Sequence, residues 1–133
     1  MSAENVELVR RFYAALNAND LGSVRTLCDD AIEYVNPDEA TEPGTRIGPD
    51  AFRAAFEGLH ASFEGFRCEP EEITPFGDSV VVVARSTGAG RMSDIPFTEV
   101  HGHLLALRDG RITSFRWFQT VEEAYAAARA PGG

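Results

Sequence analysis

Two histidines, two positions apart, are the side chains of this sequence best suited to proton transfer. His101 and His103 fall in segment 98–107, which alternates as a β-strand does, so they share one face with Leu105 and Leu107. A neutral imidazole beside an apolar wall can accept or donate a proton near neutral pH. His103 is therefore the candidate catalytic acid or base, and His101 a candidate ligand contact. The alternative is a pair of core histidines whose nitrogens are hydrogen-bonded within the protein.

Three polar side chains on other predicted strands could bind an oxygen atom of a ligand. Tyr34 and Asn36 share a face of a predicted strand at 31–37, and Arg85 lies in the Val-rich segment 79–87. A buried arginine needs a carboxylate or an anionic ligand, and we expect Arg85 to be the buried charge of the site. The alternative is a polar floor whose groups only satisfy one another.

Six aromatic side chains fall on apolar stripes of the predicted helices and on one face of the last predicted strand. Two lie in the first helical segment, two on the apolar stripe of the helix after Gly48, and two on one face of the last strand. Large rings of this kind line many small-molecule sites. The candidate ligand contacts are Phe12, Tyr13, Phe56, Phe63, Phe115 and Trp117.

Carboxylates are expected to be scarce on the inner faces. Most acidic residues fall in turns, in helix starts and in a loop at 38–46, and Glu99 is assigned to the face opposite the two histidines. The histidines and acids show no metal-ligand spacing, and residues 88–90 precede no helix that could complete a phosphate loop. We therefore expect no metal and no cofactor.

The charge balance limits the partners. The 133-residue chain has 21 acidic against 12 basic residues and a formal net charge of −9, so nucleic acid is not an expected partner. No apolar run approaches the roughly 20 residues of a membrane helix, and the N-terminus lacks the pattern of a secretory signal. Cys28 and Cys68 are expected to be small buried hydrophobes in a reduced, cytoplasmic chain.

Apolar periodicity predicts one domain over residues 1–133, with an ordered core at about 3–129. The predicted helices are 2–16, 20–27, 49–63 and 121–130, and the predicted strands are 31–37, 67–76, 79–87, 96–107 and 111–119. Residues 88–90 are predicted to bend and 131–133 to form a frayed tail. Short turns between the last four strands require antiparallel pairing. The expected fold class is α+β, with one curved antiparallel sheet and helices on one face.

Three segments resemble the SnoaL-like branch of the nuclear transport factor 2-like superfamily. They are LVRRFYAALNANDL at 8–21, AIEYVNP at 31–37 with the helix after Gly48, and LLALRDGRITSFRWF at 104–118. The resemblance implies a cystatin-like cone, in which a curved antiparallel sheet wraps around the N-terminal helices and leaves one blind pocket at its wide end. Relatives include polyketide cyclases, ketosteroid isomerases and limonene epoxide hydrolases, and others that only bind or dimerise. The fold alone therefore does not assign an activity.

The resemblance keeps one catalytic position of the cyclases and changes those of the isomerases. SnoaL-like cyclases carry a histidine just before the same type of turn, as His103 does, but their aspartate base falls at Trp117. The catalytic tyrosine of the ketosteroid isomerases falls at Phe12, although Tyr13 is adjacent. Their base aspartate falls at Asn36, and their oxyanion-hole aspartate falls near His103. Neither mechanism is expected intact.

The epoxide hydrolases match in part. They hold a water with a tyrosine and an asparagine two residues apart, as Tyr34 and Asn36 are, and with an arginine that matches Arg85. Their two catalytic aspartates fall at Thr87 and Trp117. A water could be held, but no carboxylate is expected to deprotonate it.

Two classes of function remain open. The first is an orphan isomerase, cyclase, lyase or hydrolase that acts on a small hydrophobic, oxygen-bearing molecule with His103 as acid or base. The second is a non-catalytic module that binds such a molecule or dimerises. Both predict a homodimer through an apolar outer sheet face, whose expected residues are Val100, Leu104, Ile112 and Phe118.

Overall fold

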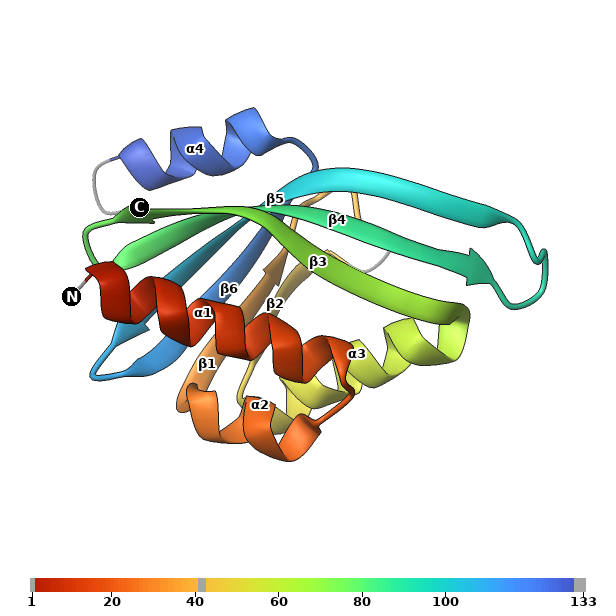
Figure 1. Ribbon diagram of the computed structural model, residues 1–133, viewed down its shortest axis with the longest axis horizontal. Coiled ribbons are helices and arrows are strands. Elements are labelled where there is room, and N and C mark those ends of the chain that lie inside the picture. Colours follow the sequence, from red (N-terminus) through yellow and green to blue (C-terminus); the bar gives the residue numbers. More distant parts are fainter. Residues whose placement is uncertain (1, 41–42, 131–133) are drawn as a thin grey trace.

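The chain folds as four helices and six strands over the residues that the computed structural model describes, 2–40 and 43–130 (Figure 1). The helices are α1 (Ser2–Asn17), α2 (Leu21–Leu27), α3 (Pro49–Ser62) and α4 (Val121–Arg129). The strands are β1 (Cys28–Asn36), β2 (Gly44–Ile47), β3 (Phe63–Phe76), β4 (Ser79–Gly90), β5 (Pro96–Arg108) and β6 (Arg111–Phe118). Residues 41–42 of the predicted loop and the predicted tail at 131–133 lie outside the described residues.

Local sequence signals account for where three of the helices begin. Asp20 accepts a hydrogen bond from the backbone N–H of Ser23 at 3.2 Å, which caps α2. Pro49 occupies the start of α3, where its missing N–H costs nothing. Thr120 and Glu123 form a reciprocal capping box before α4.

The sheet has the strand order β2-β1-β6-β5-β4-β3 and is curved and unclosed. Its pairs are antiparallel except β1 with β6, which run parallel, so the expectation of a wholly antiparallel sheet is wrong in this detail. β1 and β6 are far apart in the sequence, and no hairpin fixes their relative direction. The α+β class itself is confirmed.

Besides β1, which begins at Cys28 and not at residue 31, three strands differ from the sequence prediction. The loop predicted at 38–46 ends in the short edge strand β2, which is exposed except at the half-buried Arg46 and lacks apolar alternation. β3 begins at Phe63, whose φ of −128° and ψ of 134° are extended, so its assignment to the helix stripe of α3 is wrong. The bend predicted at 88–90 is the end of β4, because pairing with β5 continues as far as Ala89.

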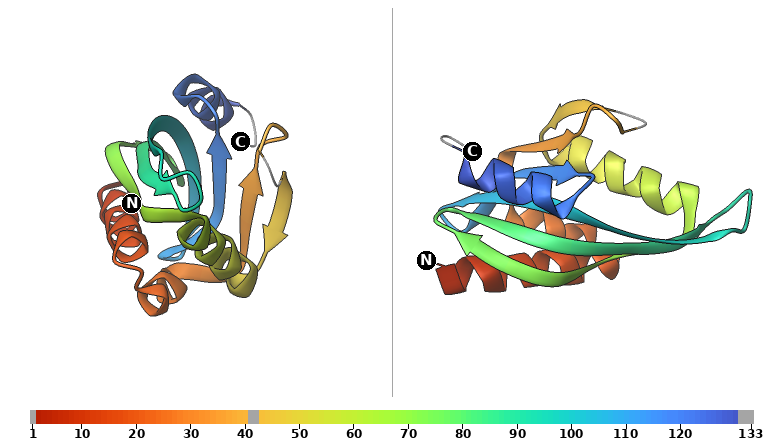
Figure 2. Two further views of the ribbon diagram at one scale, coloured as in Figure 1. Left: turned by 90° about the vertical axis from the view of Figure 1, so that its right-hand side faces the viewer. Right: turned by 90° about the horizontal axis from the view of Figure 1, so that it is seen from above.

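Both faces of the sheet are covered, but by different helices. α1, α2 and α3 lie on the inner, concave side, and α4 lies alone on the outer side, which corrects the expectation of helices on one face (Figures 1 and 2). Gly102 on β5 lets α4 approach closely, since a Cβ there would lie 2.6 Å from the Cβ of Ala124. Leu104 and Val81 are buried beneath α4. The inner face holds the main core.

Two of the residues predicted to form an exposed apolar face on the outside of the sheet are buried. Leu104 is 2% exposed beneath α4, and Ile112 is 0% exposed in the inner core. The β5–β6 register shifts between Ala106 and Leu107, which turns Ile112 inward although simple alternation places it outward. Val100 remains 42% exposed.

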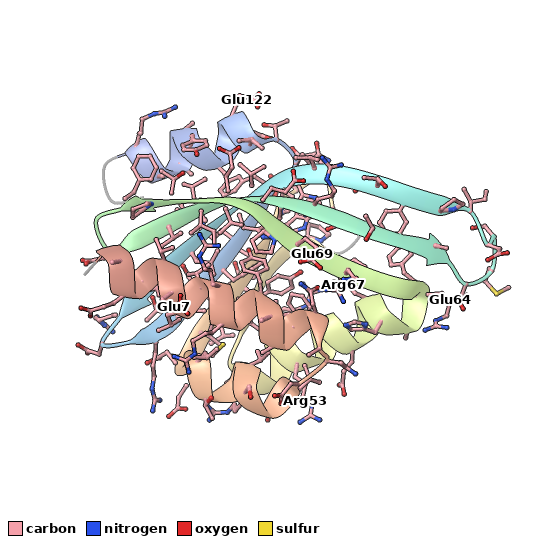
Figure 3. All side chains as sticks on the ribbon, in the orientation of Figure 1. Glu7, Arg53, Glu64, Arg67, Glu69 and Glu122 are labelled. Carbon is pink, nitrogen blue, oxygen red and sulfur yellow. The ribbon has the colours of Figure 1, made fainter. Side chains whose placement is uncertain are left out.

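The charged side chains that are labelled in Figure 3 lie at the periphery of the fold. The labelled residues in Figure 3, Glu7, Arg53, Glu64, Arg67, Glu69 and Glu122, all project from the outside of helices and strands. Among the described residues, no helix combines the length and apolarity that crossing a membrane requires.

Candidate functional site

A buried tyrosine–histidine hydrogen bond joins α1 to the inner face of β5. The hydroxyl oxygen of Tyr13 lies 2.5 Å from Nδ1 of His103, and the two side chains are 0% and 1% exposed. Phe115 of β6 packs against the imidazole, with ring centroids 4.6 Å apart. Because 90 residues separate Tyr13 from His103 in the sequence, only the folded chain brings them together.

The other ring nitrogen of His103, Nε2, is buried and has no hydrogen-bond partner among the described residues. A neutral histidine carries one proton, on Nδ1 or on Nε2. If Tyr13 donates to Nδ1, only the Nε2–H is left unpaired. If Nδ1 carried the proton, both the tyrosine hydrogen and Nε2 would be unpaired. Since each unpaired buried group costs free energy, Tyr13 is the donor and Nε2–H is an unused donor.

A second polar group lies beside the first on the same face. Nε2 of His101 lies 3.2 Å from the hydroxyl of Ser86 on β4, and the Cys68 thiol on β3 is also hydrogen-bonded to Ser86. His101 is 5% exposed and its ring lies 5.2 Å from that of Trp117. The rings of His101 and His103 are 4.9 Å apart.

α1 also fixes the position of Cys68. The side-chain amide of Asn17 donates to the carbonyl of Cys68 and accepts from its backbone N–H, both at 2.8 Å. Tyr13 and Asn17 are four residues apart and so lie on one side of α1. One helix surface therefore orients both His103 and Cys68.

Burial keeps this cluster uncharged at neutral pH. Desolvation lowers the pKa of His101 to about 4, and desolvation together with the neighbouring His101 lowers the pKa of His103 well below its usual value. Burial likewise raises the pKa of the Cys68 thiol to about 11 and that of Tyr13 well above its usual value. The imidazoles are therefore neutral hydrogen-bonding groups at pH 7.

Arg85 is not the buried charge that the sequence predicts. Its guanidinium forms an exposed ion pair with Glu71, with Nε 2.8 Å from Oε2, and the two side chains are 42% and 40% exposed. That hydrogen bond and the charge of Glu71 raise the pKa of Arg85. Ser86, the next residue, takes the inner position instead, because successive side chains on a strand point to opposite faces.

Glu99 shares the face of the histidines, and its assignment to the opposite face is wrong. Glu99 pairs with Ser86 and His101 with Ala84, and residues two apart on a strand face the same way. Glu99 is exposed, near the rim of the inner face, so the buried cluster itself holds no carboxylate among the described residues.

The remaining predicted contacts divide into a buried group and a half-buried group. Phe12, Phe56, Phe115 and Tyr34 are at most 5% exposed and pack on one another in the core. Asn36, Phe63 and Trp117 are half-buried. Trp117 packs on the edge of the core together with Ala55, Leu59 and Phe66.

Two surface hollows formed by described residues do not contain the histidines. One, of about 280 Å³, lies between α2 and the start of α3 and includes Arg25 and Phe52. The other, of about 390 Å³, lies between the start of α1 and the β5–β6 turn and includes Asp78 and Asp109. The blind pocket at the wide end of the cone stays a prediction.

Sequence reasoning missed three members of the cluster. The sequence predicts Cys68 only as a small buried hydrophobe, ends the first helix at residue 16, one position before Asn17, and gives no signal for Ser86. Continuing the alternation of His101 and His103 across the neighbouring strands would have selected Ser86 and Cys68 once the register was known. The amide clamp of Asn17 has no local sequence signal, since its partner is 51 residues away.

Comparison with known proteins agrees with this architecture. Residues 9–115 match the SnoaL-like domain family. A search of curated proteins gives no match. The fold is similar to a putative SnoaL-like polyketide cyclase from Jannaschia sp. CCS1, with 24% identity over 98% of this chain and 94% of that one and a TM-score of 0.79.

Two further solved structures have the same fold and hold small molecules. A hypothetical protein with a ketosteroid isomerase-like fold from Catenulispora acidiphila DSM 44928, in complex with trimethylamine, has 22% identity over 94% of both chains and a TM-score of 0.76. TerC, co-crystallized with polyporic acid, has 20% identity over 96% of this chain and 99% of that one and a TM-score of 0.78.

Proposed function

The chain belongs to the SnoaL-like domain family, and from that premise we propose that it binds a small, largely apolar molecule that carries a neutral acceptor oxygen. One observation carries the proposal: the Nε2–H of His103 is buried and has no hydrogen-bond partner among the described residues. An unpaired buried donor costs about 1–3 kcal/mol. A ligand that supplied an oxygen at this nitrogen would recover that free energy.

The chemistry of the surroundings selects the ligand. The cluster holds neutral groups at pH 7, so an ionic ligand would meet no opposite charge there and would lose its hydration. A ketone, quinone or ether oxygen accepts a hydrogen bond without that cost. The half-buried side chains Ala55, Leu59, Phe66 and Trp117, which line the edge of the core, offer an apolar surface for the carbon skeleton.

An enzyme of the isomerase, cyclase, lyase or hydrolase type is the second candidate. The placement of Glu99 favours it, because this carboxylate shares the inner face with His101 and His103. In such a reaction His103 Nε2–H would polarise the substrate oxygen, and Glu99 would take a proton from the substrate. The neutral imidazoles themselves are poorly matched to general acid catalysis at pH 7.

We also propose a homodimer in a reducing, cytoplasmic setting. Val100 is exposed on the outer face, and Phe118 is half-buried there against the cluster beneath α4. Cys28 and Cys68 are both free. Sedimentation velocity at micromolar concentration tests the dimer. A monomer there would exclude it.

Trp117 is the only tryptophan of the chain, so its fluorescence reports binding at the cluster. We expect 1-tetralone, a bicyclic ketone, to quench this fluorescence and to bind about tenfold more tightly than tetralin, which has the same skeleton without oxygen. In His103→Phe the two affinities should become equal, whereas His60→Gln on α3 should keep the difference. Equal affinities in the wild type, or a difference that survives in His103→Phe, would refute the proposal.

A further inference from the structure

Three metal-ligating side chains, one thiol and two imidazoles, converge on the inner face. Sγ of Cys68 and one ring nitrogen from each of His101 and His103 lie within 4.8 Å of one another, and all three side chains are buried. They come from two strands, β3 and β5, with β4 between them. A second observation is independent of this spacing: Nε2 of His103 has no hydrogen-bond partner in the described part of the chain, and this side chain is 1% exposed.

We propose that Cys68, His101 and His103 bind one Cu(I) ion, and that the bound ion keeps the oxygen-bearing ligand away from His103 Nε2. The first half of this proposal stands without any organic ligand. The second half rests on the proposed function, since the same nitrogen cannot donate a hydrogen bond and coordinate a metal.

The donor set and the charge balance select the ion. Thiolate and imidazole are the ligands that Cu(I) and Zn(II) prefer among the first-row metals. One thiolate and two neutral imidazoles around Cu(I) give a complex with no net charge, whereas the same ligands around Zn(II) leave one positive charge. The buried cluster holds no carboxylate among the described residues. An uncompensated charge is unfavourable in such a buried site, so Cu(I) is favoured.

The geometry requires only a small contraction. With metal–ligand distances of about 2.0–2.3 Å, two ligand atoms on one ion lie roughly 3.3–3.8 Å apart. The three atoms are within 4.8 Å of one another without an ion, so shifts of about 1 Å would suffice. Tyr13 holds the ring of His103 and Asn17 holds the backbone of Cys68. Such outer contacts orient metal ligands in known sites.

The proton balance of binding is defined. The S–H bond of Cys68 breaks as the Cu–S bond forms, and that proton leaves to solvent. The proton of His103 moves from Nε2 to Nδ1, so Tyr13 changes from hydrogen-bond donor to acceptor. Because one thiol proton is released for each ion bound, the apparent affinity for Cu(I) should rise with pH across the neutral range.

The test is an anaerobic Cu(I) titration of the whole chain against a chromophoric Cu(I) chelator. The wild type should take up one ion per chain, with near-ultraviolet thiolate-to-copper absorption. Cys68→Ser should lose more than about 100-fold in affinity, and His101→Gln should also bind more weakly. Cys28→Ser is the matched control, since Cys28 is 2% exposed but outside the cluster, and should bind as the wild type does.

Each outcome decides one part of the proposal. No uptake by the wild type, or uptake lost in Cys28→Ser and kept in both other variants, would overturn the site. A higher affinity for Zn(II) than for Cu(I) at equal pH would overturn the choice of ion. If the bound ion keeps the organic ligand away from His103, one equivalent of Cu(I) should weaken 1-tetralone binding in the wild type. It should leave that binding unchanged in Cys68→Ser. If 1-tetralone does not bind the metal-free protein, the proposed function fails, while the Cu(I) titration still decides the metal site.

Discussion

The two faces of the β4–β5 hairpin treat polar side chains in opposite ways. On the inner face, Ser86, His101 and His103 are at most 5% exposed and neutral at pH 7. On the outer face, one residue from Ser86, Arg85 forms an ion pair with Glu71 in contact with water. The charged groups of this ion pair are in contact with water, which screens them. The neutral groups are buried, where a hydrogen bond is stronger and an unpaired polar group is costly.

The difference indicates where a ligand should act. An exposed ion pair is already solvated and gains little from a partner. A buried, unpaired N–H gains a full hydrogen bond from a ligand oxygen. A ligand is therefore expected to gain more from the uncharged buried cluster of the inner face than from an exposed ion pair such as Arg85 with Glu71.

The largest contrast between the faces should appear in packing. Phe115 on the inner face is 1% exposed, so Phe115→Ala should lower the free energy of unfolding by about 3–5 kcal/mol. Phe118 on the outer face is half-buried, and Phe118→Ala should cost about 1 kcal/mol. Urea unfolding of both variants measures the difference. Equal losses would contradict the assignment of the two faces.

Acid should destabilise the inner face specifically. An unfolded histidine takes up a proton near pH 6.5, but burial keeps His101 neutral down to about pH 4. The unfolded state then binds more protons, so the free energy of unfolding should fall by about 3 kcal/mol between pH 6.5 and 4 on account of His101. His103 acts in the same direction.

His101→Gln isolates that contribution by urea unfolding at several pH values. The groups that face His101 are His103, Cys68 and the exposed Glu99, and all three remain in the variant. Its stability should fall less between pH 6.5 and 4 than that of the wild type. Parallel profiles would show that His101 is not held neutral by burial.

Removing one hydroxyl should cost more inside than outside. Tyr13→Phe leaves Nδ1 of His103 unpaired and should lower stability by about 1–3 kcal/mol. Tyr125→Phe removes the hydroxyl that lies 3.1 Å from Thr74 on the part-buried outer face, and should cost about 1 kcal/mol or less. Thermal unfolding measures the stability lost in each variant. A larger loss in Tyr125→Phe than in Tyr13→Phe would contradict the difference between the two faces.

The smallest effect belongs to the outer ion pair. Arg85→Gln should change stability less than Tyr125→Phe does, and 1-tetralone binding should be unchanged, because the guanidinium lies on the opposite face from His103. Added salt should reduce even this difference. A marked loss of 1-tetralone binding in Arg85→Gln would contradict the placement of Arg85 outside the ligand site.

Alternation of apolar and polar residues predicts which side chains of one strand share a face. It does not predict the register between neighbouring strands. His101, His103 and Leu105 are correctly placed on one buried face by their spacing alone. Arg85 is misplaced because the run Val80–Val83 is apolar on both faces and gives no phase. The shift at Ala106–Leu107 that turns Ile112 inward has no signal in the sequence either.

The cluster itself depends on contacts between distant segments. Tyr13 reaches His103 across 90 residues, and Asn17 reaches Cys68 across 51. Neither contact follows from periodicity, since each depends on how α1 crosses the sheet. The sequence could therefore predict the fold class and one histidine face, but not the neighbours that give this face its chemistry.

The protonation state of His103 tests the central claim most directly. A two-bond ¹⁵N–¹H correlation spectrum of the metal-free, ligand-free protein at pH 7 distinguishes the two neutral tautomers from the imidazolium. Because Tyr13 donates to Nδ1 and burial disfavours the charged ring, we predict a neutral His103 with its proton on Nε2. An imidazolium, or a proton on Nδ1, would contradict the account of an unused donor on the inner face.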